Sequence, residues 1–359
     1  MPKVRAAVCR EFGQPFTIET VTIPDPGPGE VLVRIGACAI CHSDITYAEG
    51  KWGGRIPAIY GHEAAGKIEK TGPGVTLPVG QSVIVTLIKA CRECRVCASG
   101  KWNHCENPGL TPDAISESGE AIERSLYCGA FAEAVVVDQS QIAPVPDDMP
   151  MDVASLIACG VITGVGAAVR SAELKVGETA VVIGAGGVGL NVIQGARIAG
   201  ASRIIALDLI EEKLEAALAF GATHTVLASE PKPWTKVREL TGGRGADAVF
   251  VSIGSTVAYD QAPKYMAQGG GRIIIVGLPH QGGMSEYEPI RVAMDGQAIW
   301  GSKMGDIVLA RDIPWIIDLY EQGRLKLDEL ITRRWKLEEI NAAIEDTKGG
   351  FARRNVIVF

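Results

Sequence analysis

The pattern of hydrophobic and polar residues divides the chain into two textures. In the first, short segments rich in apolar residues are separated by turns of glycine and proline, such as PDPGPGE at 24–30. These segments predict β-strands over 31–40, 64–72, 82–88 and 131–138. Up to about residue 150 the chain is therefore expected to be mainly β.

From residue 177 onward, apolar strands and helical segments alternate. Strand-like segments are ETAVVIGAG, RIIALD, ADAVFVSIG and GRIIIVGLP, and the helical segments between the first three are VGLNVIQGARIAGA and EEKLEAALAFGA. This alternation predicts βαβ units, and hence an α/β fold with a doubly wound parallel sheet covered by helices on both faces. The tail from about residue 300 adds an amphipathic helix, IPWIIDLYEQG, and a final strand, NVIVF.

Length and composition limit the class of protein. A chain of 359 residues favours two domains, which we place at 1–160 with 300–359 and at 161–299. No run reaches the ~18 consecutive apolar residues that a membrane span requires, and MPKVRAAVCREFG lacks the apolar core of a signal peptide. The net charge of −7 argues against nucleic acid as a partner. We expect a cytoplasmic protein without a membrane partner.

Four of the nine cysteines lie in CRECRVCASGKWNHC, at 91, 94, 97 and 105. A reducing cytoplasm disfavours disulfides, and a redox pair does not explain the two additional cysteines. An iron–sulfur cluster is the stronger rival, but its fourth cysteine usually follows after three residues and precedes proline. Here seven residues intervene and Glu106 follows. Four thiolates on a short charged loop favour a closed, tetrahedral zinc site.

A glycine-rich turn opens the first βαβ unit. The strand runs into Gly184, Gly186, Gly187, Val188 and Gly189, where a helix begins, and the next strand ends at Asp208. Glycines allow a dinucleotide's pyrophosphate to approach the helix N-terminus, and an acid about 20 residues on binds the ribose hydroxyls. Because that acid would repel the additional phosphate of NADP and no arginine follows it, the segment predicts an NAD site.

A second group of metal-binding residue types is dispersed along the chain. CHSD supplies Cys41 and His42, GHE supplies His62 and Glu63, and Cys159 lies in ACGVITG. Each motif is weak by itself, because buried cysteines are more often packing residues. Two cysteines and one histidine are nevertheless a known ligand set of catalytic zinc, which keeps its fourth position open.

The chain resembles the zinc-dependent alcohol dehydrogenases of the medium-chain dehydrogenase/reductase superfamily. The resemblance rests on motifs that follow the family's order: CHSD, GHEAAG, the four-cysteine segment, CGVITG, GAGGVG and Asp208. The resemblance covers nearly the whole chain. It implies a Rossmann coenzyme domain, a mainly β GroES-like catalytic domain and two zinc ions per subunit. The structural zinc would be held by Cys91, Cys94, Cys97 and Cys105, and the catalytic zinc by Cys41, His62 and Cys159. Cys9, Cys38 and Cys128 match no ligand position and are expected to be packing residues.

The resemblance also implies roles for single residues. Ser43 would take the alcohol proton, Asp44 would orient His62, and Glu63 would assist ligand exchange at the metal. His42 and Arg354 would contact the pyrophosphate, Thr163 the nicotinamide, and Lys213 the adenosine ribose. One position departs from the family pattern, because Thr46 stands where many relatives have the histidine that completes a proton relay. The route by which the proton leaves is therefore open.

Four residues correspond to the family's substrate cleft: Trp52, Leu87, Phe131 and Leu278. An apolar pocket of this kind favours medium or bulky hydrophobic alcohols. We therefore expect an NAD-dependent oxidoreductase for alcohols and aldehydes or ketones. The alternatives are a thiol-dependent dehydrogenase of the formaldehyde type and a non-enzymatic NAD-binding sensor. The resemblance further implies a homo-oligomer paired through its nucleotide-binding domains, as a dimer rather than a tetramer.

Overall fold

The computed structural model describes all residues, 1–359, and divides the chain into two compact units. The first unit comprises 1–160, 308–323 and 327–359, and the second comprises 161–307 and 324–326. The return to the first unit comes later than our boundary at 300, because β16 (Ala298–Gly301) is still a strand of the parallel sheet.

The first unit is mainly β. It contains a closed barrel in the order β1-β2-β7-β8-β4 and a seven-stranded sheet in the order β10-β6-β5-β3-β18-β17, in which β9 also pairs with β3. The strands are β1 (Lys3–Cys9), β2 (Thr17–Thr22), β3 (Glu30–Ala39), β4 (Ala58–Ile59), β5 (Glu63–Thr71), β6 (Ser82–Val85), β7 (Ala114–Ser116), β8 (Ala121–Arg124), β9 (Ala134–Asp138), β10 (Ile142–Pro144), β17 (Ile331–Lys336) and β18 (Arg354–Val358).

Strand β3 is the centre of this sheet. It pairs antiparallel with β5, β9 and β18, and Val31, Val33 and Ile35 on one of its faces are buried in the core. The helices of this unit are α1 (His42–Ala48), α2 (Arg95–Ala98), α3 (Met151–Leu156), α10 (Leu309–Glu321) and α11 (Ile340–Lys348). Because β3 leads into α1 and β5 begins at Glu63, the sheet brings the CHSD and GHE motifs to neighbouring strand ends.

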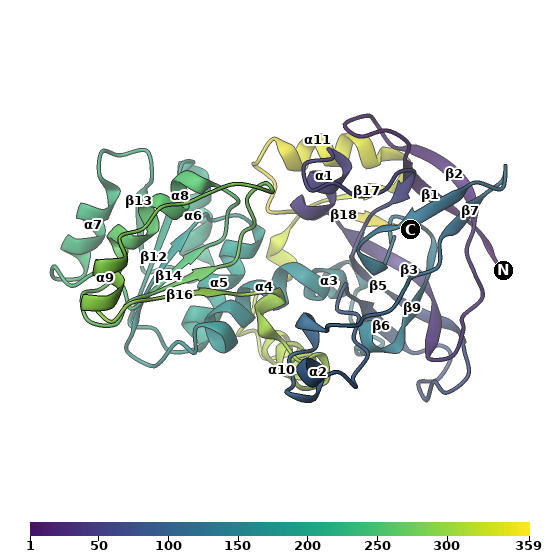
Figure 1. Cartoon of the computed structure of the whole chain (residues 1–359), viewed down its shortest axis with the longest axis horizontal. Coiled ribbons are helices and arrows are strands. Elements are labelled where there is room, and N and C mark those ends of the chain that lie inside the picture. The colour runs from purple at the N-terminus through teal and green to yellow at the C-terminus, as the bar shows by residue number, and fades with distance from the viewer. The chain divides into compact units, whose positions relative to one another are not determined.

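The second unit is a six-stranded parallel sheet in the order β13-β12-β11-β14-β15-β16, flanked by helices (Figure 1). Its other strands are β11 (Thr179–Ile183), β12 (Arg203–Asp208), β13 (His224–Leu227), β14 (Ala248–Val251) and β15 (Arg272–Ile275). Its helices are α4 (Ile162–Gly166), α5 (Gly187–Ile198), α6 (Glu211–Ala219), α7 (Pro233–Leu240), α8 (Thr256–Gln261) and α9 (Pro289–Met294). Every residue of β11 is buried, as expected for a central strand covered on both faces.

One helical run is long and apolar enough to resemble a membrane span, Met151–Ser171. It is 89% buried inside the protein over its most apolar stretch, as a core helix would be, so it is weak evidence for a membrane span. Two wider π-helical turns interrupt it, at Ile157–Val161 and Ala167–Ser171. Such turns frequently occur at functional sites, and the first of them carries Cys159.

Candidate active site and metal centres

Four potential metal ligands from separate segments of the first unit meet in its interior. Cys41 precedes α1, His62 and Glu63 lie at the start of β5, and Cys159 lies in the π-helical turn. Their ligand atoms all lie within 4.8 Å of one another. The three residues of the predicted catalytic zinc set are therefore neighbours in space.

The orientation of His62 identifies the atom that it offers to this group. Its Nδ1 lies 2.8 Å from Oδ1 of Asp44, which is itself buried. Asp44 also accepts hydrogen bonds from the backbone N–H groups of Gly61, at 2.9 Å, and Cys41, at 3.2 Å. In the neutral imidazole, the carboxylate favours the tautomer with the proton on Nδ1 and the lone pair on Nε2. Nε2 is buried and has no hydrogen-bond partner.

The two thiols of this set differ in their electrostatic surroundings. A hydrogen bond from Cys159 and the positive charge of nearby groups hold the pKa of Cys41 well below its usual range, whereas the same hydrogen bond and burial raise the pKa of Cys159. The thiolate form is the form that binds metals. Two cysteine sulfurs and an imidazole nitrogen fit a zinc ion with one open coordination position. The unpartnered Nε2 of His62 is the observation that supports this fit.

Glu63 is held beside the ligands by a buried ion pair. Its Oε2 accepts hydrogen bonds from the Arg354 guanidinium and from the backbone N–H of Gly160, the latter at 3.4 Å. Burial raises the pKa of Glu63 to about 7, although Arg354 opposes this. Oε1 has no partner. The side chain thus keeps one oxygen free within the ligand group.

The π-helical turn leaves room for this ion pair only because residue 160 is glycine. A Cβ atom on Gly160 would lie 2.6 Å from Nη1 of Arg354, which is closer than real contacts allow. The same turn presents the Cys159 side chain and the Gly160 N–H to the ligand group. It therefore supplies both a ligand and a support for Glu63.

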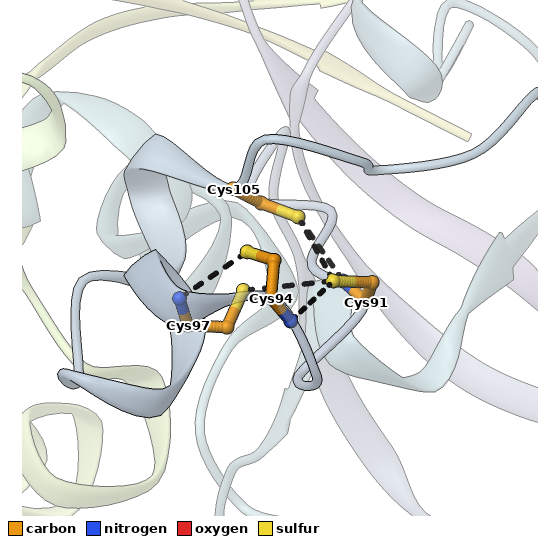
Figure 2. A group of neighbouring side chains, drawn as sticks. All are labelled: Cys91, Cys94, Cys97 and Cys105. Carbon is orange, nitrogen blue, oxygen red and sulfur yellow. Dashed lines mark hydrogen bonds between the residues drawn. The ribbon is translucent and has the colours of Figure 1, made fainter.

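The four clustered cysteines form a separate group around α2. Figure 2 shows the side chains of Cys91, Cys94, Cys97 and Cys105 drawn together, and their sulfur atoms all lie within 4.8 Å. The sulfur atoms of Cys105 and Cys91 lie 3.5 Å apart, and those of Cys91 and Cys97 lie 4.0 Å apart. These separations exceed a disulfide bond, and all four thiols are free.

Backbone N–H groups point at the sulfurs of this group. The N–H groups of Cys94, Cys97 and Cys91 donate to Cys91, Cys94 and Cys105 respectively, at 3.3–3.4 Å. Backbone donors, including the N–H of Glu106, lower the pKa of Cys94 to about 6. Four sulfurs without an open position suit a structural zinc ion.

In the second unit, β11 leads into a tight glycine turn. Gly184 has a φ of 96°, and a Cβ atom on Gly189 would lie 1.8 Å from the carbonyl oxygen of Gly184. Helix α5 begins at Gly187, after Gly186 as its N-cap. The glycines therefore allow the turn to close directly onto the first turn of the helix, where free N–H groups can receive a phosphate.

Asp208 lies at the end of β12 and braces that turn. Its Oδ2 accepts a hydrogen bond from the backbone N–H of Ala185 at 2.8 Å, and its Oδ1 accepts one from Ile210 at 3.2 Å. Ser252, after β14, donates to the carbonyl oxygens of Ile183 and Gly184, at 3.0 and 2.9 Å. Ser252 was not among the residues predicted from the sequence, although a polar residue directly after a buried strand is a usable signal.

Comparison with known proteins identifies the family. The profile of the alcohol dehydrogenase GroES-like domain matches residues 27–147, and that of the zinc-binding dehydrogenase domain matches 187–322. Putative alcohol dehydrogenase D of Mycobacterium tuberculosis is 37% identical, over 99% of this chain and all of that protein. The chain belongs to the zinc-dependent alcohol dehydrogenase family. The predicted GroES-like and Rossmann architecture is thereby confirmed.

Other members differ in what their names state. The NDMA-dependent alcohol dehydrogenase of Amycolatopsis methanolica is 36% identical, over 99% of this chain and 99% of that protein. The S-(hydroxymethyl)glutathione dehydrogenase of Paracoccus denitrificans is 35% identical, over 99% of this chain and 100% of that protein.

Solved structures of related proteins agree on the fold. A zinc-binding alcohol dehydrogenase domain protein of Burkholderia ambifaria has a TM-score of 0.95 at 32% identity, covering 100% of this chain and 99% of the other. Benzyl alcohol dehydrogenase of Acinetobacter calcoaceticus has a TM-score of 0.93 at 29% identity, with both chains fully covered. A zinc-binding dehydrogenase of Sinorhizobium meliloti, bound to NADP, has a TM-score of 0.84 at 26% identity and full coverage.

Two further residues predicted from the dehydrogenase resemblance, His42 and Ser43, lie in the first turn of α1. Ser43 is half-buried in its first turn and His42 is exposed. Thr46 donates from its hydroxyl to the carbonyl oxygen of His42 at 2.8 Å, as threonine often does in a helix. Arg354, predicted to contact the pyrophosphate, forms an ion pair with Glu63 that was not predicted from the sequence.

Of the predicted cleft residues, three lie in the first unit. Trp52 is half-buried, with its ring edge-on to Tyr47 at 5.2 Å, and Leu87 packs partly buried against the core. Phe131 is fully buried in that core. Leu278 lies in the second unit and is 61% exposed there.

Two predicted cofactor residues lie on helices of the second unit. Lys213 is half-buried in α6, and Thr163 in α4 donates to the sulfur of Met304 at 3.8 Å. The packing role expected for the remaining cysteines fits their positions, since Cys9, Cys38 and Cys128 are all buried.

Proposed function

We propose that this protein is an NAD- and zinc-dependent alcohol dehydrogenase that interconverts alcohols and aldehydes or ketones by hydride transfer. The buried, unpartnered Nε2 of His62 among the sulfurs of Cys41 and Cys159 is the observation that carries the proposal. A non-enzymatic NAD sensor has no use for such an open metal set, so we do not favour that alternative.

Each residue of the site has a role in this reaction. Cys41, His62 and Cys159 hold a zinc ion, which as a Lewis acid would favour loss of the alcohol proton and polarise a carbonyl oxygen in the reverse direction. Asp44 keeps the His62 proton on Nδ1, so that Nε2 remains a ligand. Ser43, two residues after Cys41, takes the alcohol proton. Glu63, held by Arg354, provides an oxygen that can replace a departing ligand.

The nicotinamide cofactor that we propose is NAD. Asp208 supports this choice, because it places a carboxylate beside the glycine turn, where the adenosine ribose of a dinucleotide would lie. Its charge opposes the additional phosphate of NADP. A structural neighbour at 26% identity is bound to NADP, so both cofactors must be tested.

A medium or bulky hydrophobic alcohol is the substrate class that we propose. The benzyl alcohol dehydrogenase among the structural neighbours supports it, as does the apolar character of Trp52 and Leu87. Relatives named S-(hydroxymethyl)glutathione dehydrogenase support the second candidate, a thiol-dependent oxidation of formaldehyde. Thr46, in place of the relay histidine, is compatible with either reaction.

We further propose two zinc ions per subunit, a cytoplasmic location and a homodimer paired through the second unit. The four-cysteine group supports the second zinc ion, because it is a complete ligand set separate from the first. The exposed edge of β16 supports the dimer.

The decisive experiment is steady-state kinetics with alcohols and aldehydes of increasing size, each with NAD and NADP, on protein whose metal content is measured. We expect roughly two zinc ions per chain and turnover of benzyl alcohol with NAD. Turnover that requires a thiol and formaldehyde would favour the second candidate. Absence of turnover by zinc-loaded protein, both with every alcohol and with formaldehyde plus a thiol, would refute both.

A further inference from the structure

Helix α5, which follows the glycine turn, carries two polar side chains on its buried face. Asn191 and Gln194 are only 1% and 3% exposed. Helix α4 packs so closely here that a Cβ atom on Gly164 would lie 2.5 Å from Cβ of Asn191. Buried amide groups cost free energy unless their donors and acceptors find partners. The partners of these two side chains therefore indicate what they do.

The two amides are joined to each other and to the backbone at both ends. Asn191 donates from Nδ2 to the carbonyl oxygen of Gly187 at 2.8 Å, and its Oδ1 accepts from Nε2 of Gln194 at 3.1 Å. Gln194 also donates to the carbonyl oxygen of Lys326 at 3.0 Å and accepts from its N–H at 2.7 Å. We call this continuous set of hydrogen bonds, from Lys326 through Gln194 and Asn191 to Gly187, the amide ladder.

The amide ladder has a direction. A backbone N–H can only donate and a backbone carbonyl can only accept. Lys326 at one end and Gly187 at the other therefore fix the orientation of both side-chain amides between them. Each amide accepts on the side of Lys326 and donates toward Gly187. Hydrogen bonds arranged in this way polarise one another, so the last donor, Nδ2 of Asn191, is strengthened.

The ladder ends on a peptide group of the predicted phosphate site. The carbonyl of Gly187 belongs to the same peptide unit as the N–H of Val188. Because α5 begins at Gly187, the N–H of Val188 is one of the four that have no acceptor within the helix. Such N–H groups bind phosphate. A hydrogen bond to the carbonyl of this peptide makes its N–H a better donor.

The other end of the ladder is held in place by further contacts. Segment 324–326 belongs to the second unit, although the residues before and after it belong to the first. Nζ of Lys326 donates to the carbonyl oxygen of Ala219, at the end of α6, at 2.9 Å. Leu325 beside it is buried. The backbone of Lys326 is therefore a fixed partner for Gln194.

We propose that Asn191 and Gln194 are positioning residues of the dinucleotide site, which orient the Gly187–Val188 peptide group and strengthen its N–H as a donor to the pyrophosphate. The inference rests on the proposed NAD site at the glycine turn and adds two residues that act on it from the buried face of α5. Loss of the ladder should therefore weaken ligands that carry phosphate and spare ligands that do not.

The test compares the binding of NAD, ADP-ribose and adenosine to wild type, Asn191→Leu and Gln194→Met by calorimetry. Both substitutions replace an amide by an apolar side chain of similar shape. We expect NAD and ADP-ribose to bind about fivefold more weakly to each variant, within the range found for residues that act on a site without touching its ligand. Adenosine, which has no phosphate, should bind to all three proteins equally.

A matched control removes a similar clasp elsewhere. The side chain of Gln81 in the first unit donates from Nε2 to the carbonyl oxygens of Ser82 and Val145, at 3.1 and 3.4 Å. Gln81→Met should bind NAD, ADP-ribose and adenosine as the wild type does. Weaker binding of ADP-ribose to Gln81→Met, by the same factor as to Gln194→Met, would contradict the inference.

Two further variants separate the ladder from simple support of the 324–326 segment. Asn191→Leu/Gln194→Met should bind ADP-ribose no more weakly than the single variants, because either substitution already breaks the ladder. Asn191→Ser should bind it more tightly than Asn191→Leu, since a serine hydroxyl can donate to the carbonyl four residues earlier, as the hydroxyl of Thr347 does to Ala343 at 2.8 Å. If only Gln194→Met weakens binding, Gln194 merely holds the segment and the proposal is wrong.

The outcomes distinguish this inference from the function beneath it. If the wild type binds NAD and oxidises alcohols, but Asn191→Leu and Gln194→Met bind ADP-ribose as it does, the inference is overturned and the proposed function stands. Equal weakening of adenosine and ADP-ribose would show a general disturbance of the second unit and would also overturn it. If the wild type binds neither NAD nor NADP, the proposed function fails together with the inference.

Discussion

At the scale of single residues, the Asp44 carboxylate holds the metal-binding group together. It accepts hydrogen bonds from His62 Nδ1 and from the backbone N–H groups of Gly61 and Cys41. These contacts fix the ring of one ligand and the backbone of another. Asp44 therefore organises two of the three proposed zinc ligands while lying outside the set itself.

We predict that Asp44→Ala lowers zinc affinity about 10–100-fold, the range seen when such supporting partners are removed. The substitution leaves two buried donors and one part-buried donor without acceptors, so thermal stability should fall as well. Competition with a chromogenic chelator measures the affinity. Asp44→Asn, which keeps an acceptor oxygen, should fall between wild type and Asp44→Ala. Equal zinc affinity in Asp44→Ala and wild type would contradict this role.

Cys159 and Cys97 belong to different groups, and their loss should have different effects. Cys159→Ala removes one of three ligands of the proposed catalytic zinc, so turnover should be abolished while NAD still binds to the glycine turn. Cys97→Ala opens the four-cysteine group and should chiefly lower the melting temperature. Turnover, NAD fluorescence titration and thermal unfolding of both variants test the contrast. Near-normal turnover in Cys159→Ala would refute the ligand assignment.

Asp208 should select NAD over NADP. Hydrogen bonds from the ribose to a carboxylate contribute roughly 1.5–3 kcal/mol each, and the same charge repels the NADP phosphate. We predict a preference for NAD of at least about a hundredfold in kcat/KM, equivalent to ~2.7 kcal/mol, and a narrower ratio in Asp208→Ala. Steady-state kinetics with both cofactors measures it, and an unchanged ratio would rule out Asp208 as the selector.

Asp208→Ala should have a second effect, because Asp208 also accepts a hydrogen bond from the backbone N–H of Ala185. Asp208→Ala also removes a brace of the glycine turn, so binding of both dinucleotides should weaken in part for a reason unrelated to the ribose. Asp208→Asn keeps an acceptor for the Ala185 N–H and removes only the charge. Comparing the two variants therefore separates support of the turn from repulsion of the phosphate.

At the scale of elements, local patterns predicted most of the fold. The alternation in 31–40 and 64–72 corresponds to β3 and β5, and RIIALD is β12. The glycine turn was recognisable because its glycines, strand and helix are contiguous. The four-cysteine group was recognisable for the same reason, since its cysteines lie within fifteen residues of one another.

What escaped prediction depends on contacts between distant segments. Glu63 and Arg354 are 291 residues apart, and the residues around each of them show no pattern that predicts an ion pair. The π-helical turn around Cys159 is likewise invisible in an apolar stretch that satisfies helix periodicity. Both features arise because packing in the first unit brings β5, β18 and this turn together.

We predict that Gly160→Ala disturbs this junction. The added methyl group would overlap Arg354 Nη1, so the guanidinium must move away from Glu63. Overpacking of this kind costs about 1–3 kcal/mol of unfolding free energy, measurable by chemical denaturation. Gly349→Ala is the control, because its nearest neighbour would be 3.3 Å away and its φ of −60° suits alanine. Equal stability of the two variants would contradict the predicted clash.

At the scale of the whole molecule, the second unit exposes an unpaired sheet edge. Strand β16 pairs only with β15, and Ile299 and Trp300 on it are 37% and 47% exposed. An apolar edge strand with free backbone N–H and C=O groups can form hydrogen bonds with a strand of another chain. Nearby in sequence, α9 has no buried residue although it carries Ile290 and Met294, which are 71% and 80% exposed.

Two copies related by a twofold axis would satisfy both features at once, because an edge strand can pair antiparallel with its own copy and the interface is then self-complementary. We predict a dimer by light scattering at micromolar concentration. Trp300→Glu places like charges opposite each other across the axis and should shift the protein toward monomer, whereas Val79→Glu, at an exposed position of the first unit, should not. A monomeric wild type would refute the pairing, and a Trp300→Glu dimer as stable as wild type would place the interface elsewhere.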